Sequence, residues 1–206
     1  MKKLLIFLPI LLGILSCQEE PQYVIPKPPP YNFTFEIDSA MNRFGTRSLR
    51  QDEAGYYHLK LSESTFQTFS RITGKFLWNG KPNPIPSPVD CRIEWKSSHY
   101  WVLNNKSSLF VVYKTYFNEF TGKLTTVELG TIKAQSNSII PTVNGSSYPS
   151  SSDGSVNTIF APIYPMKGDT ITVTAIARIL KEIPTSKLFV RMERDSLERK
   201  VRFICE

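Results

Sequence analysis

Apolar and polar residues alternate along much of this chain, and the alternation is clearest between Asp169 and Leu180. Every second residue from Ile171 to Ile179 is apolar, whereas residues such as Thr172 and Arg178 occupy the positions between them. A period of two places one set of side chains on the buried face of a β-strand and the other set on the solvated face. The segment therefore predicts a strand with one wet face.

The same alternation, or a short run of β-branched and aromatic residues, recurs between clusters of Gly, Pro, Asn and Ser. Strand-forming residues dominate, and 15 prolines oppose helices. Roughly ten short strands predict an all-β fold, an antiparallel β-sandwich such as the Ig-like type. The expected strands are Phe33–Asp38, Tyr56–Leu61, Arg71–Trp78, Cys91–Lys96, His99–Leu103, Leu109–Phe117, Leu124–Ala134, Thr158–Tyr164, Asp169–Leu180, Lys187–Arg194 and Lys200–Cys205.

Two tight turns separate strands in this pattern. The Asn79-Gly80 pair predicts a type I′ hairpin turn, because both residues accept positive φ. A second turn, Met166 to Asp169, carries Gly168 and precedes the clearest strand. The stretch Ile72 to Pro82 resembles the opening strand and turn of transthyretin-like and carboxypeptidase-regulatory-like domains, which implies a structural or binding module.

The first residues read as a secretory signal. Lys2 and Lys3 form a positive start, an apolar run extends from Leu4 to Leu15, and the small Ser16 precedes Cys17. The apolar run is shorter than the roughly 20 residues that a spanning helix needs. It is therefore expected to be a leader and not a membrane span.

Ile14-Leu15-Ser16-Cys17 resembles the lipobox of bacterial lipoproteins, and Gln18-Glu19-Glu20 resembles the acidic export tag of Bacteroidota surface lipoproteins. The resemblance implies that Cys17 carries acyl chains and that the chain is anchored in the outer membrane, at the surface or on the periplasmic side. Several acyl chains together make a stable anchor. The alternative is an ordinary cleaved signal with an incidental cysteine.

These features divide the chain into three parts. Residues 1–16 are the expected lipoprotein signal peptide, and 17–31 the lipidated linker, whose prolines favour an extended polyproline stalk. Residues 32–206 are the expected β-sandwich domain, long enough for one core of ordinary size. Gln135 to Val156, rich in serine, is expected to be a mobile surface loop or a contact loop.

Cys91 and Cys205 remain once Cys17 is assigned to the lipid, and both fall on the apolar side of their strands. Disulfides persist in exported proteins, so these two either pair or stay separate as small buried hydrophobes. No metal site is expected, because the chain lacks Cys-x-x-Cys and neither histidine has a ligand at useful spacing. No cofactor is expected either.

No catalytic motif of comparable strength is present, so the chain is not expected to be an enzyme. There is no Gly-x-Ser-x-Gly elbow, phosphate-binding loop or His-Glu-x-x-His. His99 is a weak candidate base and more naturally a surface histidine or one with satisfied hydrogen bonds. Paired carboxylates for glycoside hydrolysis would have to meet in space, and no pair is indicated.

Candidate contact residues come from aromatic density and from charge. Tyr100 and Trp101 are candidates for ligand or partner contact, with Trp101 expected to be exposed and Trp78 and Trp95 expected in the core. The formal net charge is +7, and basic residues gather near the C-terminal strands. A basic stripe suits phosphates, acidic glycans or an acidic protein, unless it is only a solvated face. The residues concerned are Arg191, Arg194, Arg199, Lys200 and Arg202.

The sequence thus predicts a lipid-anchored outer-membrane protein that binds without catalysis. The leading hypothesis is an accessory component of a cell-envelope assembly with an envelope protein as partner. A carbohydrate-binding surface lipoprotein is the alternative, and an envelope hydrolase is the third hypothesis. Nucleic acid is not an expected partner.

Overall fold

A computed structural model describes residues 24, 31–83, 89–104, 106, 109–133, 140–186 and 188–206. The expected signal peptide 1–16, Cys17 and nearly all of the expected linker lie outside the described residues. The fold is all-β, as the alternation predicts, and its only regular helical element among the described residues is the short 3-10 turn η1 at Tyr164–Met166. The strands are β1 Phe33–Asn42, β2 Tyr57–Leu59, β3 Ser70–Trp78, β4 Val89–Ser97, β5 His99–Asn104, β6 Leu109–Asn118, β7 Lys123–Lys133, β8 Ser146–Ser147, β9 Ser155–Phe160, β10 Thr170–Pro184 and β11 Val190–Cys205.

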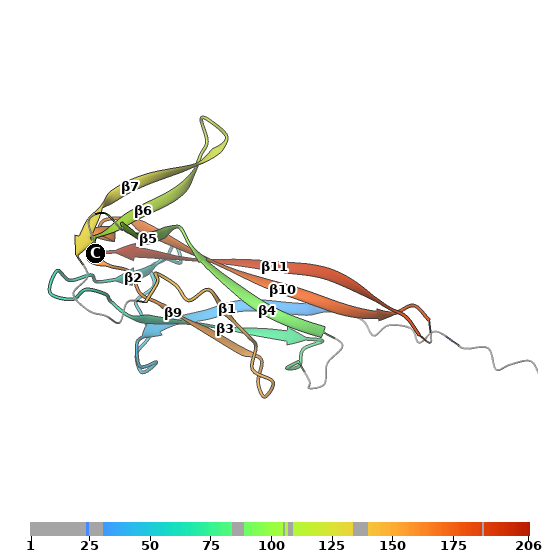
Figure 1. Ribbon diagram of the computed structural model, residues 1–206. Helices are drawn as coiled ribbons and strands as arrows, with labels where there is room; N and C mark the ends of the chain where they lie inside the picture. The colour runs from blue at the N-terminus through green and yellow to red at the C-terminus, as the bar shows by residue number, and fades with distance from the viewer. Residues whose placement is uncertain are drawn as a thin grey trace, which may run out of the picture. The chain divides into compact units, whose positions relative to one another are not determined.

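Two of the three sheets form a sandwich around one core (Figure 1). The first has the strand order β1-β3-β9, and the second has the order β2-β11-β10-β4-β8. Phe160 of β9 and Phe203 of β11 meet across the core with ring centroids 4.3 Å apart. The alternating apolar set from Ile171 to Ile179 is buried, so the period of two is confirmed as a core face.

One strand pair departs from the expected antiparallel pattern. β2 pairs parallel to β11, with Tyr57 beside Phe203 and Leu59 beside Cys205. The Glu206 amide continues the ladder by donating to the Leu59 carbonyl at 2.9 Å. Parallel strands need a long connection between them, and here most of the chain supplies it.

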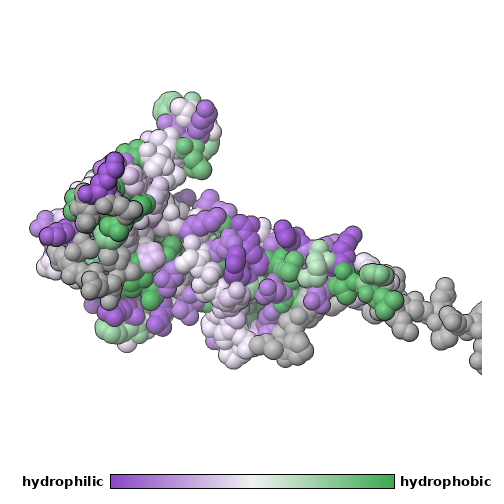
Figure 2. All heavy atoms as spheres, in the orientation of Figure 1, coloured by the Kyte–Doolittle hydropathy of each residue, from purple (hydrophilic) through white to green (hydrophobic). Residues whose placement is uncertain are grey.

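The third sheet, β5-β6-β7, branches off at Ser98, the single residue between β4 and β5. Its β6–β7 hairpin projects from the sandwich (Figure 1). Phe120 at the hairpin turn is fully exposed, and Phe117 and Leu124 beside the turn are also exposed. Figure 2 shows this apolar group amid polar residues.

The predicted turns form as expected. Asn79 and Gly80 have φ values of 50° and 74°, and the amide of Trp78 donates to the carbonyl of Lys81 at 2.8 Å. This is the type I′ geometry, which matches the twist of the flanking strands. Gly168 has a φ of 88° in the turn that precedes β10.

Two predictions of elements are wrong. The two expected strands Lys187–Arg194 and Lys200–Cys205 are not separate, because the single strand β11 runs from Val190 to Cys205 and polar residues continue its pairing with β10 across the interval. The expected strand Thr158–Tyr164 begins at Ser155 and ends at Phe160.

The Ser-rich segment is not simply a mobile loop where it is described. Residues 134–139 lie outside the described residues, but Thr142 and Val143 are buried and β8 pairs with β4. The indole nitrogen of Trp95 donates to the Ser147 hydroxyl at 2.8 Å. Contacts with the core therefore fix the segment that follows residue 140.

By contacts, the chain separates into two compact units. The larger comprises residues 30–182 and 192–206 and contains the sandwich. The smaller includes residues 183–191, which are the end of β10, the connection after it and the start of β11.

Candidate functional site

A hollow in the sandwich surface lies over the solvated face of β4, β10 and β11, and we call it the charged trough. Its volume is about 710 Å³. Alternation forces this composition, because the residues between the core positions of each strand must point outward. The lining residues are Asp90, Arg92, Glu94, Tyr148, Arg178, Ile179, Leu180, Arg194, Asp195 and Ser196.

Glu94 holds two arginines in place on the floor of the trough. Arg92 and Arg178 are register partners on β4 and β10. Glu94 Oε1 accepts from Arg92 Nη2 at 2.7 Å, and Glu94 Oε2 accepts from Arg178 Nε at 3.1 Å. These hydrogen bonds hold the pKa of Glu94 below its ordinary value. Both arginine side chains remain 49% exposed, so further N–H groups face the solvent.

Tyr148 and Arg194 complete the trough from two other parts of the chain. Tyr148 follows β8 in the Ser-rich segment and is 63% exposed, whereas Arg194 projects from the basic strand β11. Next to Arg194, Asp195 lies 3.6 Å from the ammonium group of Lys181. The trough thus combines an exposed aromatic ring with fixed groups of both charges.

A second, smaller hollow lies where the third sheet meets β10. Its volume is about 440 Å³. Lys96, Lys114 and Lys200 line it together with several hydroxyl groups, and Phe117 and Leu124 supply apolar wall. Lys114 pairs with Asp169, and Lys200 lies 3.1 Å from Glu198, so neighbouring carboxylates offset two of its three cations.

The structure reverses the expected exposure of the two aromatic candidates. Trp101, expected to be exposed, is partly buried and packs against the core, because strand β5 turns that face toward the sandwich. Tyr100 is the more exposed of the two and stacks on Tyr113, with centroids 5.5 Å apart. Neither residue lines the charged trough.

The basic candidates are all exposed but do not form one site. Arg194 lines the charged trough and Lys200 the smaller hollow. Arg202 stacks over the Tyr56 ring, and Arg199 donates to the backbone carbonyl of Glu198. Arg191 lies in the smaller unit, at the β10–β11 turn. Alternation along β11 distributes these cations instead of gathering them.

Cys91 and Cys205 are separate free thiols, so the candidate disulfide is not formed. Both are buried, and burial raises the pKa of each thiol to about 12. They behave as small hydrophobes on the core faces of β4 and β11. Thiols with such a pKa are poor nucleophiles near neutral pH.

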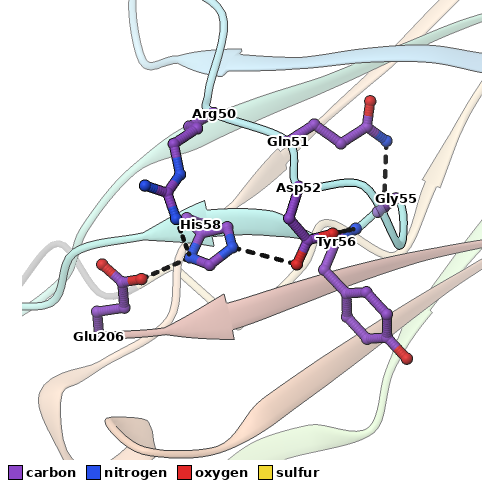
Figure 3. Close-up of polar contacts among 7 residues, drawn as sticks. All are labelled: Arg50, Gln51, Asp52, Gly55, Tyr56, His58 and Glu206. Carbon is purple, nitrogen blue, oxygen red and sulfur yellow. Dashed lines mark hydrogen bonds and ion pairs between the residues drawn. The ribbon is translucent and has the colours of Figure 1, made fainter.

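His58 is the centre of a polar cluster beside the parallel pair (Figure 3). Its Nδ1 lies 2.5 Å from Glu206 Oε1, and its Nε2 lies 3.3 Å from Asp52 Oδ2. Arg50 approaches the same ring, and the Tyr56 amide donates to Asp52 at 2.8 Å. The hydrogen bond from the Tyr56 amide is the main cause of the lowered pKa of Asp52. The hydrogen bond with His58 is the main cause of the lowered pKa of Glu206.

His99 has the opposite environment, which corrects the expectation of a surface or satisfied ring. It is fully buried, and its Nε2 makes no hydrogen bond. Asp169 Oδ2 is 3.6 Å from that nitrogen, beyond hydrogen-bond distance. Burial lowers the pKa of His99, Asp169 opposes this lowering, and the Lys114 ammonium group adds to it.

Ser98, His99 and Asp169 are the residue types of a hydrolytic triad, but their geometry differs from one. The Ser98 hydroxyl lies 2.9 Å from His99 Nδ1 and also accepts the Thr172 amide at 2.9 Å. A triad needs a base that can take the serine proton while a carboxylate holds its other nitrogen. Here the ring is buried and its other nitrogen is unpaired.

Within the described ranges, no group of three or more His, Cys, Asp or Glu side chains could hold a metal ion. No helix in the same ranges is long and apolar enough to cross a membrane.

Sequence reasoning missed most of the trough. Alternation along β4 and β10 points Arg92, Glu94 and Arg178 outward, but alternation does not give the strand order that aligns them. Tyr148 lies in a segment without a strand pattern. The one usable signal was the charge of these outward positions, because two arginines and a glutamate recur on neighbouring strands.

Comparison with protein-family models, with curated proteins and with solved structures gave no match. The function of this chain must therefore be argued from its own residues.

Proposed function

We propose that this protein is a lipid-anchored outer-membrane protein that binds another component of the cell envelope without catalysis. The anchor is Cys17, on the basis of the leader and lipobox-like residues. The binding site is the charged trough. The observation that carries the proposal is that the trough brings together Tyr148 of the Ser-rich segment and Arg194 of the basic strand.

The composition of the trough suits a protein partner. Arg92 and Arg178 are held by Glu94, so little side-chain freedom is lost when they bind. Arginine and tyrosine are the residue types that most often dominate binding energy at interfaces. A partner with carboxylates and an apolar side chain would engage the guanidinium groups and the Tyr148 ring together.

Purification of the tagged, lipidated protein from gently solubilised membranes tests this function. A stoichiometric envelope protein should be recovered, and Arg194→Ala should lower its recovery by roughly tenfold, the effect of about 1.4 kcal/mol. Arg199→Ala is the matched control, because Arg199 is an exposed arginine of the same strand outside the trough. Recovery that is equal for both variants would contradict docking at the trough.

A carbohydrate is the second candidate ligand, favoured by the 63% exposure of Tyr148 beside polar hydrogen-bonding groups. Flat rings stack on sugars, and the charged groups would fix the hydroxyls. If the protein is retained on a glycan array, if Tyr148→Ala abolishes this retention, and if no protein partner is recovered, the carbohydrate is the ligand.

The anchor has its own test, because Cys17→Ala should remove the acyl chains and release the protein from the outer membrane.

A further inference from the structure

The turn between β10 and β11 presents apolar side chains to the solvent. Leu188, Phe189 and Val190 are 85%, 70% and 53% exposed. We call residues 183–191 the hairpin tip. Apolar spheres gather there in Figure 2. A continuous exposed apolar group of this kind marks a binding surface or a membrane contact.

Several backbone groups of the hairpin tip are hydrogen-bonded within it. The Phe189 carbonyl accepts the amides of Thr185 at 3.0 Å and Ser186 at 3.2 Å, and also the Thr185 hydroxyl at 3.1 Å. The Ser186 hydroxyl accepts the amides of Leu188 at 3.3 Å and Phe189 at 3.1 Å. Backbone groups paired in this way remain bonded when water is removed, which is the condition for entering lipid.

The length of the linker places this turn within reach of the proposed anchor. The Tyr31 hydroxyl donates to the carbonyl of Glu182 at 2.7 Å, and Glu182 directly precedes the hairpin tip in the chain. Tyr31 lies fourteen positions after Cys17 in the chain. At about 3.1 Å per residue, an extended proline-rich chain of this length spans roughly 43 Å. Acyl chains on Cys17 therefore keep the start of the hairpin tip within that distance of the bilayer.

We propose that the hairpin tip is a second membrane contact, which inserts Leu188, Phe189 and Val190 into the interface of the bilayer that holds the anchor. The inference rests on the lipid-anchored part of the proposed function. Arg191, exposed beside Val190, supplies a cation for lipid phosphates. A hairpin that enters the interface gives the chain a second point of contact with the bilayer, besides the proposed anchor.

A fluorescent label at position 189 tests the contact in the full, lipidated chain. Phe189→Cys is labelled with an environment-sensitive dye, because Cys91 and Cys205 are buried and unreactive. The protein is reconstituted into vesicles of phosphatidylethanolamine and phosphatidylglycerol, with or without a nitroxide on the acyl chain. We expect a blue shift and the loss of about half of the fluorescence with nitroxide lipid, as for a side chain below the headgroups.

Phe120→Cys is the matched control, because Phe120 is an exposed phenylalanine at another hairpin turn. Its label should keep its fluorescence. Equal quenching at both positions, or no quenching at position 189 while the protein stays with the vesicles, would overturn the inference and leave the anchor standing. A blue shift without quenching, together with crosslinks between copies, would show that the hairpin tip contacts a second copy of the chain. That result would also overturn the inference. Loss of the protein from the vesicles would defeat both the anchor and the tip.

Discussion

His58 and His99 have environments that invert the usual relation between burial and hydrogen bonding. His58 is 14% exposed, yet both of its ring nitrogens face carboxylates. His99 is fully buried, yet its Nε2 makes no hydrogen bond and lies 3.6 Å from Asp169 Oδ2. Buried polar atoms are normally paired, because the loss of water is otherwise uncompensated. The difference teaches that His99 contributes mainly by filling space in the core, whereas His58 joins distant segments by hydrogen bonds.

Truncation of each ring gives the largest expected contrast. His99→Ala removes a fully buried side chain, so the free energy of unfolding should fall by about 2–4 kcal/mol through the cavity left behind. His58→Ala removes hydrogen bonds to two partly exposed carboxylates and should cost about 1 kcal/mol. Urea unfolding of both variants at pH 7.5 measures the two losses. Equal losses would break the contrast.

Removal of the carboxylate beside each histidine gives the next largest difference. Asp169 pairs with Lys114 between the start of β10 and the third sheet. Asp169→Asn should lower the free energy of unfolding by about 1–2 kcal/mol, because a charge-assisted hydrogen bond is lost. Asp52→Asn, beside His58, should have the smaller effect, because Asp52 is more exposed. Thermal unfolding of both variants measures the two losses of stability. A larger loss for Asp52→Asn than for Asp169→Asn would contradict the prediction.

The dependence of stability on pH separates the histidines further. The pKa of His99 is lowered from 6.5 in the folded state, so the unfolded chain binds the proton more readily. The free energy of unfolding should therefore decrease as pH falls below about 6.5. His99→Gln should flatten this decrease between pH 7 and pH 5.5. An unchanged slope in that variant would assign the loss to other groups.

The smallest expected effect concerns the carboxylates around His58. Asp52 and Glu206 have lowered pKa values when folded, so their stabilising contribution is complete above their ordinary values of 3.8 and 4.5. The contribution is lost as pH falls through the lower, folded values. Glu206→Gln should reduce the slope of stability against pH below about pH 4.5. An acid titration of unfolding, followed by circular dichroism, measures this slope. Glu53→Gln, a change at an unpaired carboxylate, is the comparison and should leave the slope unchanged.

Local pattern was enough to predict much of the fold. The period of two identified the core face of β10, and Asn79-Gly80 identified its turn type, because both depend on neighbouring residues alone. Pairing between distant strands leaves no such mark. Nothing near Tyr57 indicates that it lies beside Phe203, and Cys91 and Cys205 share core parity without meeting.

The candidate site was predictable only in its parts. The positive charge of Arg194 was noticed, but the trough also needs Tyr148 and the β4–β10 register that sets Arg92 beside Arg178. The burial of His99 depends on how the third sheet leaves the sandwich at Ser98. Trp101 turned inward for the same reason. These positions depend on packing between distant strands, which the alternation within one strand does not predict.

The parallel pairing of β2 with β11 also has a kinetic consequence. His58 and Glu206 meet although 148 positions separate them. Closing so long a loop costs conformational entropy before the two strands gain any stabilising contact. Sheets that pair distant segments therefore fold slowly. β2 therefore has no partner strand until residues 203–205 reach it during folding, and the edge of β10 stays open to wrong partners until β11 has paired with it.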